Sequence, residues 1–359
     1  MESAAVPRLS ATLVVIRETS GGLELLLLER ADKGDQNSGA WVFPGGLVDA
    51  ADLASLLPCA GTDDAQASAL LGLPQAGLAF FVAAIRECFE EAGLLFAVDG
   101  RGQPVDLRGD AGVRLAEQRQ SLNAGQCDFA SICSVAGLRL AADRLFYIGH
   151  WLTPPGLPKR FDTRFFLAVL PPGQEPLHDS REMLDHVWLL PRAALAPENA
   201  RRLLKVTRHV IELVGSFASL AALLAWARSP RDVPMVMQRR GMSADGLRSL
   251  MPHEPAYAEI GKLDPDGAGT AWCELRAGVP VRLSPHVQRI TSGSGHNSYL
   301  VGDEQTGWTA IDTAPSGSCL LVEDKVLFTG TMDVTRARQL FPPESVEWMA
   351  PARGFLVPA

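Results

Sequence analysis

The sequence has little of what membrane-spanning, secreted or nucleic-acid-binding proteins need. No apolar run approaches the twenty residues that cross a bilayer, and the N-terminus, with Glu2, lacks the basic and then apolar pattern of a signal peptide. Basic residues are outnumbered, 33 against 41 acidic ones, so the net charge of −8 offers no overall footprint for nucleic acid. These shortages predict a cytoplasmic protein that binds neither membrane nor nucleic acid.

Cysteine is also scarce and scattered. The six cysteines form no CxxC pair, and a chain of 359 residues does not need disulfide staples. We therefore expect reduced thiols in a reducing compartment and no zinc site built from cysteine. With 47% apolar and 21% charged residues the composition is globular, and the length allows two domains at roughly 150 residues each.

The most informative stretch is residues 78–95, an apolar segment with helical periodicity. Its apolar side chains recur at the spacing of a helix lying on a core, namely at Phe81, Ile85, Cys88 and Phe89. Gly93 stands where a C′ glycine would end the helix. The segment is therefore predicted to be one helix with a buried face.

Three carboxylates occupy the second half of this helix. Glu87, Glu90 and Glu91 are three and four residues apart, so they share one face. They lie near the helix C-terminus, where the macrodipole disfavours negative charge. A bound divalent cation would explain the arrangement, and oxygen ligands favour Mg²⁺ or Mn²⁺. A solvated acidic face is the alternative that spacing alone leaves open.

Further strands and helices are expected on both sides of this helix. Strands are predicted at 11–16, 23–29, 41–43, 94–98, 144–151, 164–170 and 183–189. Helices are predicted at 64–71, 113–122 and 129–136, and a long helical pattern at 197–227 breaks near residue 214. The basic residues Arg201, Arg202, Lys205 and Arg208 would form a solvated face of that pattern.

The composition of the sequence changes at residue 229. Prolines cluster there, so a linker is predicted over 229–274, between a domain at 8–228 and a region at 275–359. In the last region short strands are expected at 279–283, 287–290, 298–301, 309–312 and 325–328.

Two motifs together resemble the Nudix box. Gly45 and Gly46 follow the strand at 41–43, and residues 86–94, RECFEEAGL, fill every fixed position of the pattern REUxEExGU, in which U is apolar. Asp52 stands where the family has a Glu, and 33 residues separate it from Arg86 instead of a short spacer. Such an insert is similar to that of long-insert Nudix enzymes related to the peroxisomal coenzyme A diphosphatases, as is the run RFDTRFF at 160–166.

This resemblance implies an α/β fold, an α/β/α sandwich with a mixed central sheet, over residues 8–228 with an insert at about 53–77. It also implies divalent-metal-dependent hydrolysis of a phosphoanhydride in a nucleoside diphosphate linked to another moiety, a coenzyme A derivative being one candidate. The partner would then be a small molecule; nothing indicates the oligomeric state. A module that senses a nucleotide without hydrolysing it, using the C-terminal part as an interaction surface, is the alternative.

Site residues follow from the resemblance and from the chemistry of phosphoanhydrides. Glu90 and Glu91 are predicted to bind Mg²⁺, or Mn²⁺, with the carbonyl of Gly45. Glu87 would be a further ligand or the base that activates water. Arg86 would orient the glutamates through charge-assisted hydrogen bonds, although an exposed helix cation is the alternative.

Other candidates lie outside the box. In several family members the base is a glutamate elsewhere in the chain, and Glu175 or Glu182 could take that role; Asp52 is given no metal role. Three aromatic residues could stack on a nucleobase, and three histidines could contact phosphate, but core packing and local hydrogen bonding are the plainer expectations. These residues are Trp41, Phe43, Trp188, His150, His178 and His186.

The C-terminal region carries a second resemblance. Residues 278–312 and 326–330 are similar to strands of a metallo-β-lactamase-fold hydrolase. The HxHxDH loop that holds zinc in that family has no counterpart, because no histidine lies between Asp312 and Lys325, and Thr331 replaces the later Asp. A truncated region without a binuclear site, and hence no zinc, is expected; a hydrolase activity of its own would require zinc.

Overall fold

The computed structural model describes two units of the chain. It covers residues 5–34, 37–54, 57–254, 256–274, 280–291, 297–303, 305, 307–311, 320–322, 325–327, 348–349 and 356–357. The first unit comprises residues 3–153 and 157–237, and the second comprises residues 154–156 and 238–359.

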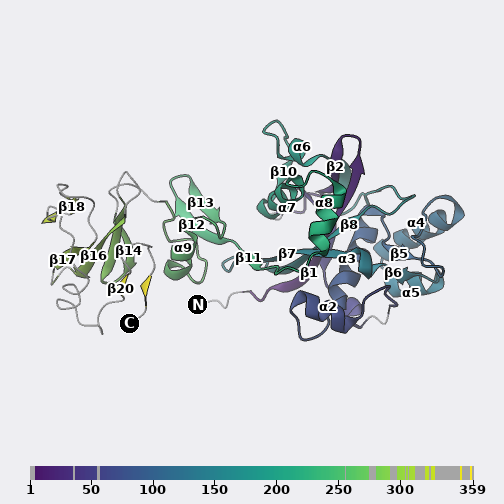
Figure 1. Ribbon diagram of the computed structural model, residues 1–359, viewed down its shortest axis with the longest axis horizontal. Helices are drawn as coiled ribbons and strands as arrows, with labels where there is room; N and C mark the ends of the chain where they lie inside the picture. The colour runs from purple at the N-terminus through teal and green to yellow at the C-terminus, as the bar shows by residue number, and fades with distance from the viewer. Residues whose placement is uncertain are drawn as a thin grey trace. The chain divides into compact units, whose positions relative to one another are not determined.

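A mixed sheet frames the first unit (Figure 1). Its order is β10-β3-β2-β1-β8-β7-β11, with β4 paired to β1 and β9 paired to β2. The strands are β1 (Arg8–Thr19), β2 (Gly22–Arg30), β3 (Ala40–Val42), β4 (Gly45–Leu47), β7 (Phe146–Leu152), β8 (Phe161–Val169), β9 (Met183–Leu189), β10 (Arg202–Leu203) and β11 (Met235–Met237). β1 runs antiparallel to β2 and parallel to β8, so the predicted mixed sheet is confirmed.

Helices surround this sheet. They are α1 (Ala50–Ala54), α2 (Asp64–Leu71), α3 (Leu78–Ala92), α4 (Gly109–Asn123), α5 (Phe129–Val135), α6 (Pro191–Leu195), α7 (Lys205–Gly215) and α8 (Leu220–Arg228), with a 3₁₀ turn, η1 (Ala142–Arg144). A short ladder of β5 (Ala97–Val98) and β6 (Arg139–Leu140) lies beyond α3. The predicted helices at 64–71 and 78–92 are confirmed.

Both faces of the sheet are covered, as a sandwich requires. In β1, Leu13 and Val15 belong to the apolar cluster around α3, whereas Val14 and Ile16 are equally buried but lie outside it. Because successive strand residues point to opposite faces, the second pair faces the side that α7 covers next to β2. In β8, residues 164–168 are all buried, so this strand is covered on both faces.

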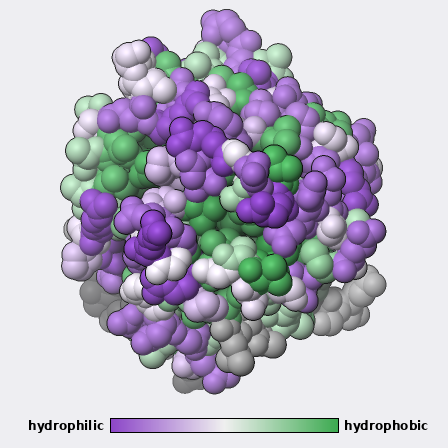
Figure 2. Space-filling model, turned by 90° about the vertical axis from the view of Figure 1, so that its right-hand side faces the viewer, coloured by the Kyte–Doolittle hydropathy of each residue, from purple (hydrophilic) through white to green (hydrophobic). Residues whose placement is uncertain are grey.

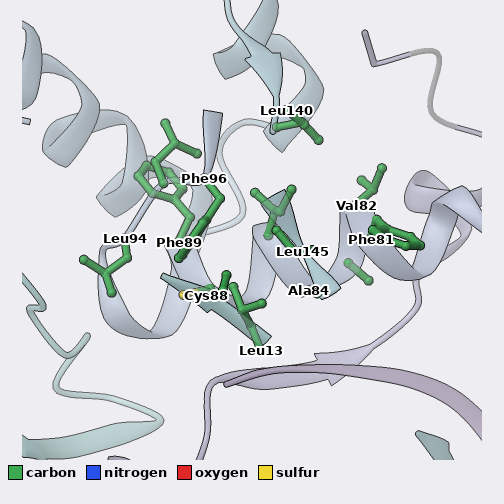
Figure 3. Close-up of a cluster of buried hydrophobic side chains, with 14 of the residues drawn as sticks. Leu13, Phe81, Val82, Ala84, Cys88, Phe89, Leu94, Phe96, Leu140 and Leu145 are labelled. Carbon is green, nitrogen blue, oxygen red and sulfur yellow. The ribbon is translucent and has the colours of Figure 1, made fainter. Parts of the chain in front are cut away.

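The core is centred on α3. Figure 3 shows side chains of this helix, Phe81, Cys88 and Phe89 among them, in one apolar layer with Leu13 of β1. Phe89 is 1% exposed, and burial of a side chain of this size contributes about 1.5–3 kcal/mol. The apolar periodicity therefore predicted the buried face of the helix correctly.

Hydrogen bonds fix the insert before α3 at both of its ends. Asp63 caps α2 at its N-terminus, and the carboxylate of Asp64 accepts the backbone N–H groups of Ala76 and Leu78, each at 2.9 Å. Asp64 thus joins the start of α2 to the start of α3. Earlier in the insert, the Ala60 N–H donates to the Leu140 carbonyl at 2.7 Å, so this part pairs with β6.

Four sequence predictions for this unit were wrong in part. The helix expected from residue 197 begins only at Lys205, because residues 202–203 form a strand beside β3. Arg201 and Arg202 consequently precede the helix, and Arg201 lies over the ring of Trp41 at 4.7 Å. Strand 94–98 is reduced to residues 97–98, and α4 begins at residue 109. Residues 45–47, which follow the predicted strand at 41–43, form the further strand β4, paired with β1.

The second unit contains small β elements. Residues 229–274, where a linker was predicted, include the hairpin β12 (Arg239–Ser243) and β13 (Gly246–Leu250) and the helix α9 (Tyr257–Leu263), with a core around Leu250 and Ile260. A four-stranded antiparallel sheet follows, built from β14 (Pro280–Ser284), β15 (Val287–Thr291), β16 (Asn297–Asp303) and β17 (Gly307–Ile311). The remaining ladders are β18 (Leu320–Val322) with β19 (Lys325–Leu327), and β20 (Trp348–Met349) with β21 (Leu356–Val357).

These strands confirm the expected β-rich character of the region. The limits of the predicted domains and the metallo-β-lactamase resemblance stay predictions. Residues 312–319, which include the place of the missing histidine motif, lie outside the described residues, as does Thr331.

No single helix in the described part of the chain has the length and hydropathy to cross a membrane. The pair α7 and α8 passes that test only together, with a bend of 110° between the helices. Five cysteines are free thiols, namely Cys59, Cys88, Cys127, Cys133 and Cys273, and Cys319 is outside the described residues.

One face of the molecule exposes a hydrophobic area bordered by hydrophilic residues (Figure 2). The first unit also contains an apolar cavity of about 380 Å³ at the C-terminal end of β8, lined in part by Phe96, Phe146 and Leu170. Residues at the opposite end of β8 line a larger cavity.

Candidate functional site

The larger cavity, of about 560 Å³, lies against the acidic face of α3. Its lining comes from β1, β2, β4, α3, β8 and the chain around α7, all in the first unit. The predicted site residues that line it are Gly45, Arg86, Glu87, Glu90, Glu91 and Glu182. Six of the seven sequence-predicted residues are thus gathered in one place, and Glu175 is not.

Strand β4 brings backbone close to the carboxylates of α3. The N–H of Gly45 donates to Glu91 Oε2 at 2.9 Å. A Cβ at Gly46 would lie 2.4 Å from the carboxyl carbon of Glu87, so glycine leaves the room that this carboxylate occupies. The double glycine is therefore required by close approach, in a strand and not in a turn.

Arg86 connects the acidic residues. It makes a bidentate pair with Asp52, from Nε at 2.9 Å and from Nη2 at 2.8 Å, and both side chains are almost fully buried. Its Nη1 donates to Glu87 at 2.9 Å and to Glu90 at 3.2 Å. The Leu47 carbonyl accepts a further bond from Nη2. Arg86 is therefore a buried organiser and not an exposed cation.

Asp52 is a site residue to which sequence reasoning gave no role. It lies on α1, and its Oδ2 also accepts the N–H of Asp49. The signal was present, because the family pattern puts a carboxylate at this position; the 33-residue separation from Arg86 concealed the pairing.

Burial makes the acidic face electrostatically costly. It raises the pKa of Glu87 to about 7, with Glu90 adding to the effect and Arg86 opposing it. Burial is also the main reason that the pKa values of Glu90 and Glu91 are raised, that of Glu91 strongly. One guanidinium does not neutralise this cluster.

The residues present fit a hard divalent cation. They offer carboxylate oxygens, the preferred ligands of Mg²⁺, in a cavity where protonation is otherwise favoured over charge. Glu87 and Glu90 share Arg86 as a partner and Glu91 accepts from Gly45, and the three carboxylates are not gathered within the 4.8 Å that a tight ligand group shows. Binding would draw them together, and whether the Gly45 carbonyl takes part stays a prediction.

Helix α4 stabilises the C-terminal end of α3. The buried Arg119 donates from Nε and Nη2 to the Glu90 carbonyl at 3.1 and 2.9 Å, and Asn123 donates to the same oxygen at 3.0 Å. A cation at this helix end offsets the unfavourable placement of the glutamates. Arg119 belongs to another helix, so the sequence of residues 78–95 could not predict this contact.

The segment before β9 is fixed to α3 and presents Glu182 to the cavity. The Leu177 N–H donates to the Ala92 carbonyl at 2.8 Å, and the Asp179 carboxylate accepts the N–H groups of Glu182 and Met183. The Glu182 carboxylate itself is exposed and pairs with Lys33 at 2.9 Å. The carboxylate expected from outside the box therefore has an anchored backbone and a free approach to solvent.

Other sequence candidates lie elsewhere. Glu175 is exposed and lies outside the cavity lining. Burial, together with His178, lowers the pKa of His186, and Asp185 and Glu175 oppose this to a smaller extent. Trp188 lies under the guanidinium of Arg17, and His150 bonds to Asp162 at 2.7 Å; neither lines the cavity.

Cations and aromatic side chains also line the cavity. Arg8, Arg30 and Lys159 are in the lining, and Arg8 lies over the ring of Phe161 at 5.3 Å. These three cations come from separate segments, and the residues around them in the sequence form no pattern that would single them out. The lining thus combines carboxylates with cations, and the buried Phe43 also belongs to it.

Comparison with known proteins gives concordant matches. The family model described as the NUDT19 Nudix domain matches residues 55–204. The acyl-coenzyme A diphosphatase NUDT19 of Gallus gallus is 30% identical over 293 residues, which cover 68% of this chain and 75% of that protein. The Homo sapiens protein of the same name is 28% identical over 281 residues, covering 66% and 73%. The crystal structure of a NUDIX hydrolase from Alicyclobacillus acidocaldarius superposes with a TM-score of 0.51 at 27% identity, covering 62% of this chain and 96% of that one.

Proposed function

Because the chain belongs to the Nudix hydrolase family, with NUDT19 acyl-coenzyme A diphosphatases among its relatives, we propose that it hydrolyses the phosphoanhydride of a coenzyme A derivative with a divalent cation. By family the chain is a Nudix-type diphosphate hydrolase; the substrate and the cation are the proposal. Hydrolysis would add water across the P–O–P bond and release two phosphate monoesters.

The observation that carries the proposal is that carboxylates and cations line the same cavity. A diphosphate needs cations around its oxygens, and Arg8, Arg30 and Lys159 offer them. The glutamates of α3 would repel the same diphosphate unless a divalent ion lay between them. Together the two kinds of side chain suit a diphosphate bridged to the protein by a metal ion.

The side chains of α3 would hold the ion. We assign Glu90 and Glu91 as ligands of Mg²⁺ or Mn²⁺, with the Gly45 carbonyl and Glu87 completing the oxygen set. When bound, such an ion neutralises phosphate oxygens and lowers the pKa of a coordinated water. Arg86 would act as a positioning residue, because its bonds to Asp52 fix the guanidinium that orients Glu87 and Glu90.

A carboxylate must also take the proton of the attacking water. We assign this to Glu182, which lines the cavity from an anchored segment. Glu87 is the competing candidate, since its pKa near 7 suits a base at neutral pH. Glu182→Gln should lower kcat by about 10²–10⁴-fold with little change in Mg²⁺ affinity. A comparable loss in Glu87→Gln alone would transfer the role to Glu87.

A substrate panel tests the proposal. Acyl-coenzyme A, coenzyme A, dephospho-coenzyme A, ADP-ribose and NADH would be incubated with Mg²⁺ or Mn²⁺, with mass detection of the products. We expect turnover of coenzyme A derivatives above the others, lost in Glu90→Gln and Glu91→Gln and kept in Glu117→Gln, an exposed glutamate of α4. Binding without any product, or turnover unaffected by the two site variants, would refute it.

A further inference from the structure

A second group of metal-binding side chains lies outside the cavity. His178, Asp185 and His186 each offer one donor atom, and these atoms all lie within 4.8 Å of one another. Within the described ranges, no other three His, Cys, Asp or Glu residues meet this criterion. None of the three lines the α3 cavity.

The fold brings the three residues together from two segments. His178 follows Leu177, whose N–H is bonded to the end of α3, and precedes the turn that Asp179 stabilises. Asp185 and His186 lie in β9, where His186 pairs with Leu28 of β2. Backbone hydrogen bonds hold both segments, so the group does not depend on its own contacts for its position.

The two imidazoles face each other through the same ring atom. Nδ1 of His178 and Nδ1 of His186 are 2.9 Å apart, with the ring centroids at 5.2 Å. Asp185 folds back so that its Oδ1 accepts the N–H of His186 at 2.7 Å. In a tetrahedral site with Zn–N bonds of 2.0–2.1 Å, neighbouring donors are about 3.3 Å apart, close to this spacing.

The sheet register places a second carboxylate beside this group. Asp185 lies directly opposite Glu29 of β2, and like charges in cross-strand pairs are destabilising. A plain hydrogen bond between two neutral histidines would not offset this charge. A bound cation would.

We propose that His178, His186 and Asp185 hold a divalent cation of the Zn²⁺ or Co²⁺ kind, separate from the carboxylates of α3. Imidazole donors select such borderline ions, whereas carboxylates alone select Mg²⁺. Three protein ligands leave a fourth position for water. Both Nδ1 atoms must present lone pairs, so the histidine that donates the present bond moves its proton to Nε2.

Sequence spacing alone did not predict this site. The two histidines are eight residues apart, which matches no compact zinc motif, and the sequence predicts no zinc because it lacks cysteine pairs and the HxHxDH loop. The pairing arises from the turn into β9. A bound cation would join the segment before β9, through His178, to β9 itself, through Asp185 and His186. Glu182 lies between these ligands in the sequence.

Titration with Co²⁺ in a large excess of Mg²⁺ tests the proposal, because visible absorption of Co²⁺ increases in sites of low coordination number. We expect one tight equivalent that Zn²⁺ displaces. His178→Gln, His186→Gln and Asp185→Asn should each weaken it by about tenfold or more, since even indirect partners of ligands act on that scale. Gln keeps a hydrogen bond to the remaining imidazole, and circular dichroism would establish that each variant is folded.

Two controls separate this site from the others. The exposed His253→Ala variant and the Glu90→Gln/Glu91→Gln double variant should keep the tight equivalent. Loss of the equivalent in the double variant, its persistence in all three site variants, or the absence of any tight Co²⁺ in the unmodified protein would each overturn the proposal. The exposed Asp185 serves as the deciding variant should a histidine change prevent folding.

Discussion

Arg86 is the residue on which the geometry of the acidic face depends. Its guanidinium satisfies Asp52 with one edge and Glu87 and Glu90 with the remaining nitrogen, while its stem is buried in α3. A lysine could supply charge but not this planar fork. The Nudix pattern predicted that an arginine orients the glutamates, but it did not predict the aspartate that holds the arginine.

Removal of the Asp52 charge should destabilise the protein. Asp52→Asn leaves Arg86 buried with an incomplete partner, and we expect a loss of about 3 kcal/mol in the free energy of unfolding, measured by urea denaturation. Asp106→Asn is the matched control, because Asp106 also pairs with an arginine, Arg108, but at the surface. Equal effects of the two changes would contradict the structural role of Asp52.

The raised pKa of Glu87 should appear as a pH dependence of stability in metal-free protein. The folded protein holds this proton up to about pH 7, whereas the unfolded chain releases it near its ordinary pKa of 4.5. The folded state therefore binds more protons between these values, and the contribution of Glu87 to stability falls as the pH rises from 4.5 to 7.

Thermal unfolding between pH 5 and 8 would measure this contribution. In EDTA, Tm of the unmodified protein should fall with pH more steeply than Tm of Glu87→Gln, and saturating Mg²⁺ should reduce the difference. Parallel curves for the two proteins in EDTA would show that Glu87 titrates normally.

Helix α3 is the part of the fold that the sequence predicted best, whereas the packing of strand β4 against it depends on tertiary contacts. Periodicity and the box predicted the helix and the positions of Glu87, Glu90 and Glu91 correctly. Two glycines after a strand allow either a close approach of the backbone or a sharp turn; here they form a strand whose neighbours leave no space for a Cβ. Close approach of two elements is a tertiary property, so local propensity could not reveal it.

The two glycines should respond differently to alanine. Gly46→Ala puts its Cβ against the mobile carboxylate of Glu87, so it should weaken Mg²⁺ binding about tenfold with little loss of stability. Gly45→Ala meets backbone, the Ala11 carbonyl at 2.5 Å and Thr12 Cα at 2.7 Å, and should cost about 1–3 kcal/mol. Calorimetric Mg²⁺ titration and urea unfolding would distinguish them. A large stability loss in both variants would contradict this difference.

The contact between α4 and the end of α3 gives another prediction. Arg119→Met removes two charge-assisted bonds to the Glu90 carbonyl and should destabilise the protein by about 1.5–3 kcal/mol. Hydrogen exchange should accelerate most at the C-terminal turn of α3. Arg114→Met, at an exposed position of the same helix, should change neither measurement.

Across the chain, the secondary structure of the Nudix part was easier to predict than that of the residues after 229. The prolines after residue 229 indicated a linker, but the next residues return to the first unit. β11 pairs with β7, and Arg231 donates to the Tyr147 carbonyl as well as to carbonyls at the end of α8. A strand of three residues directly after a proline has no periodicity that would identify it.

We therefore expect a fragment of residues 1–237 to fold and to keep the hydrolytic kcat/KM of the longer chain, because every residue that lines the α3 cavity belongs to it. A fragment ending at residue 228 should have a lower Tm, since it loses β11 and Arg231. Activity assays and thermal unfolding of the two fragments would decide. Loss of activity in the longer fragment would assign the second unit a part in the reaction.

The closure of the insert by Asp64 bears on how this chain can change in length. The residues between Asp52 and Arg86 leave and re-enter the fold at fixed points, so each doubling of that loop adds only about 0.6 kcal/mol of closure entropy. Peptide tags, reporter groups or new chain ends placed after α2, near residue 73, would leave the carboxylates where they are. The insert thus interrupts the Nudix box where added length costs the fold little free energy. It is therefore a place where the sequence can lengthen during evolution.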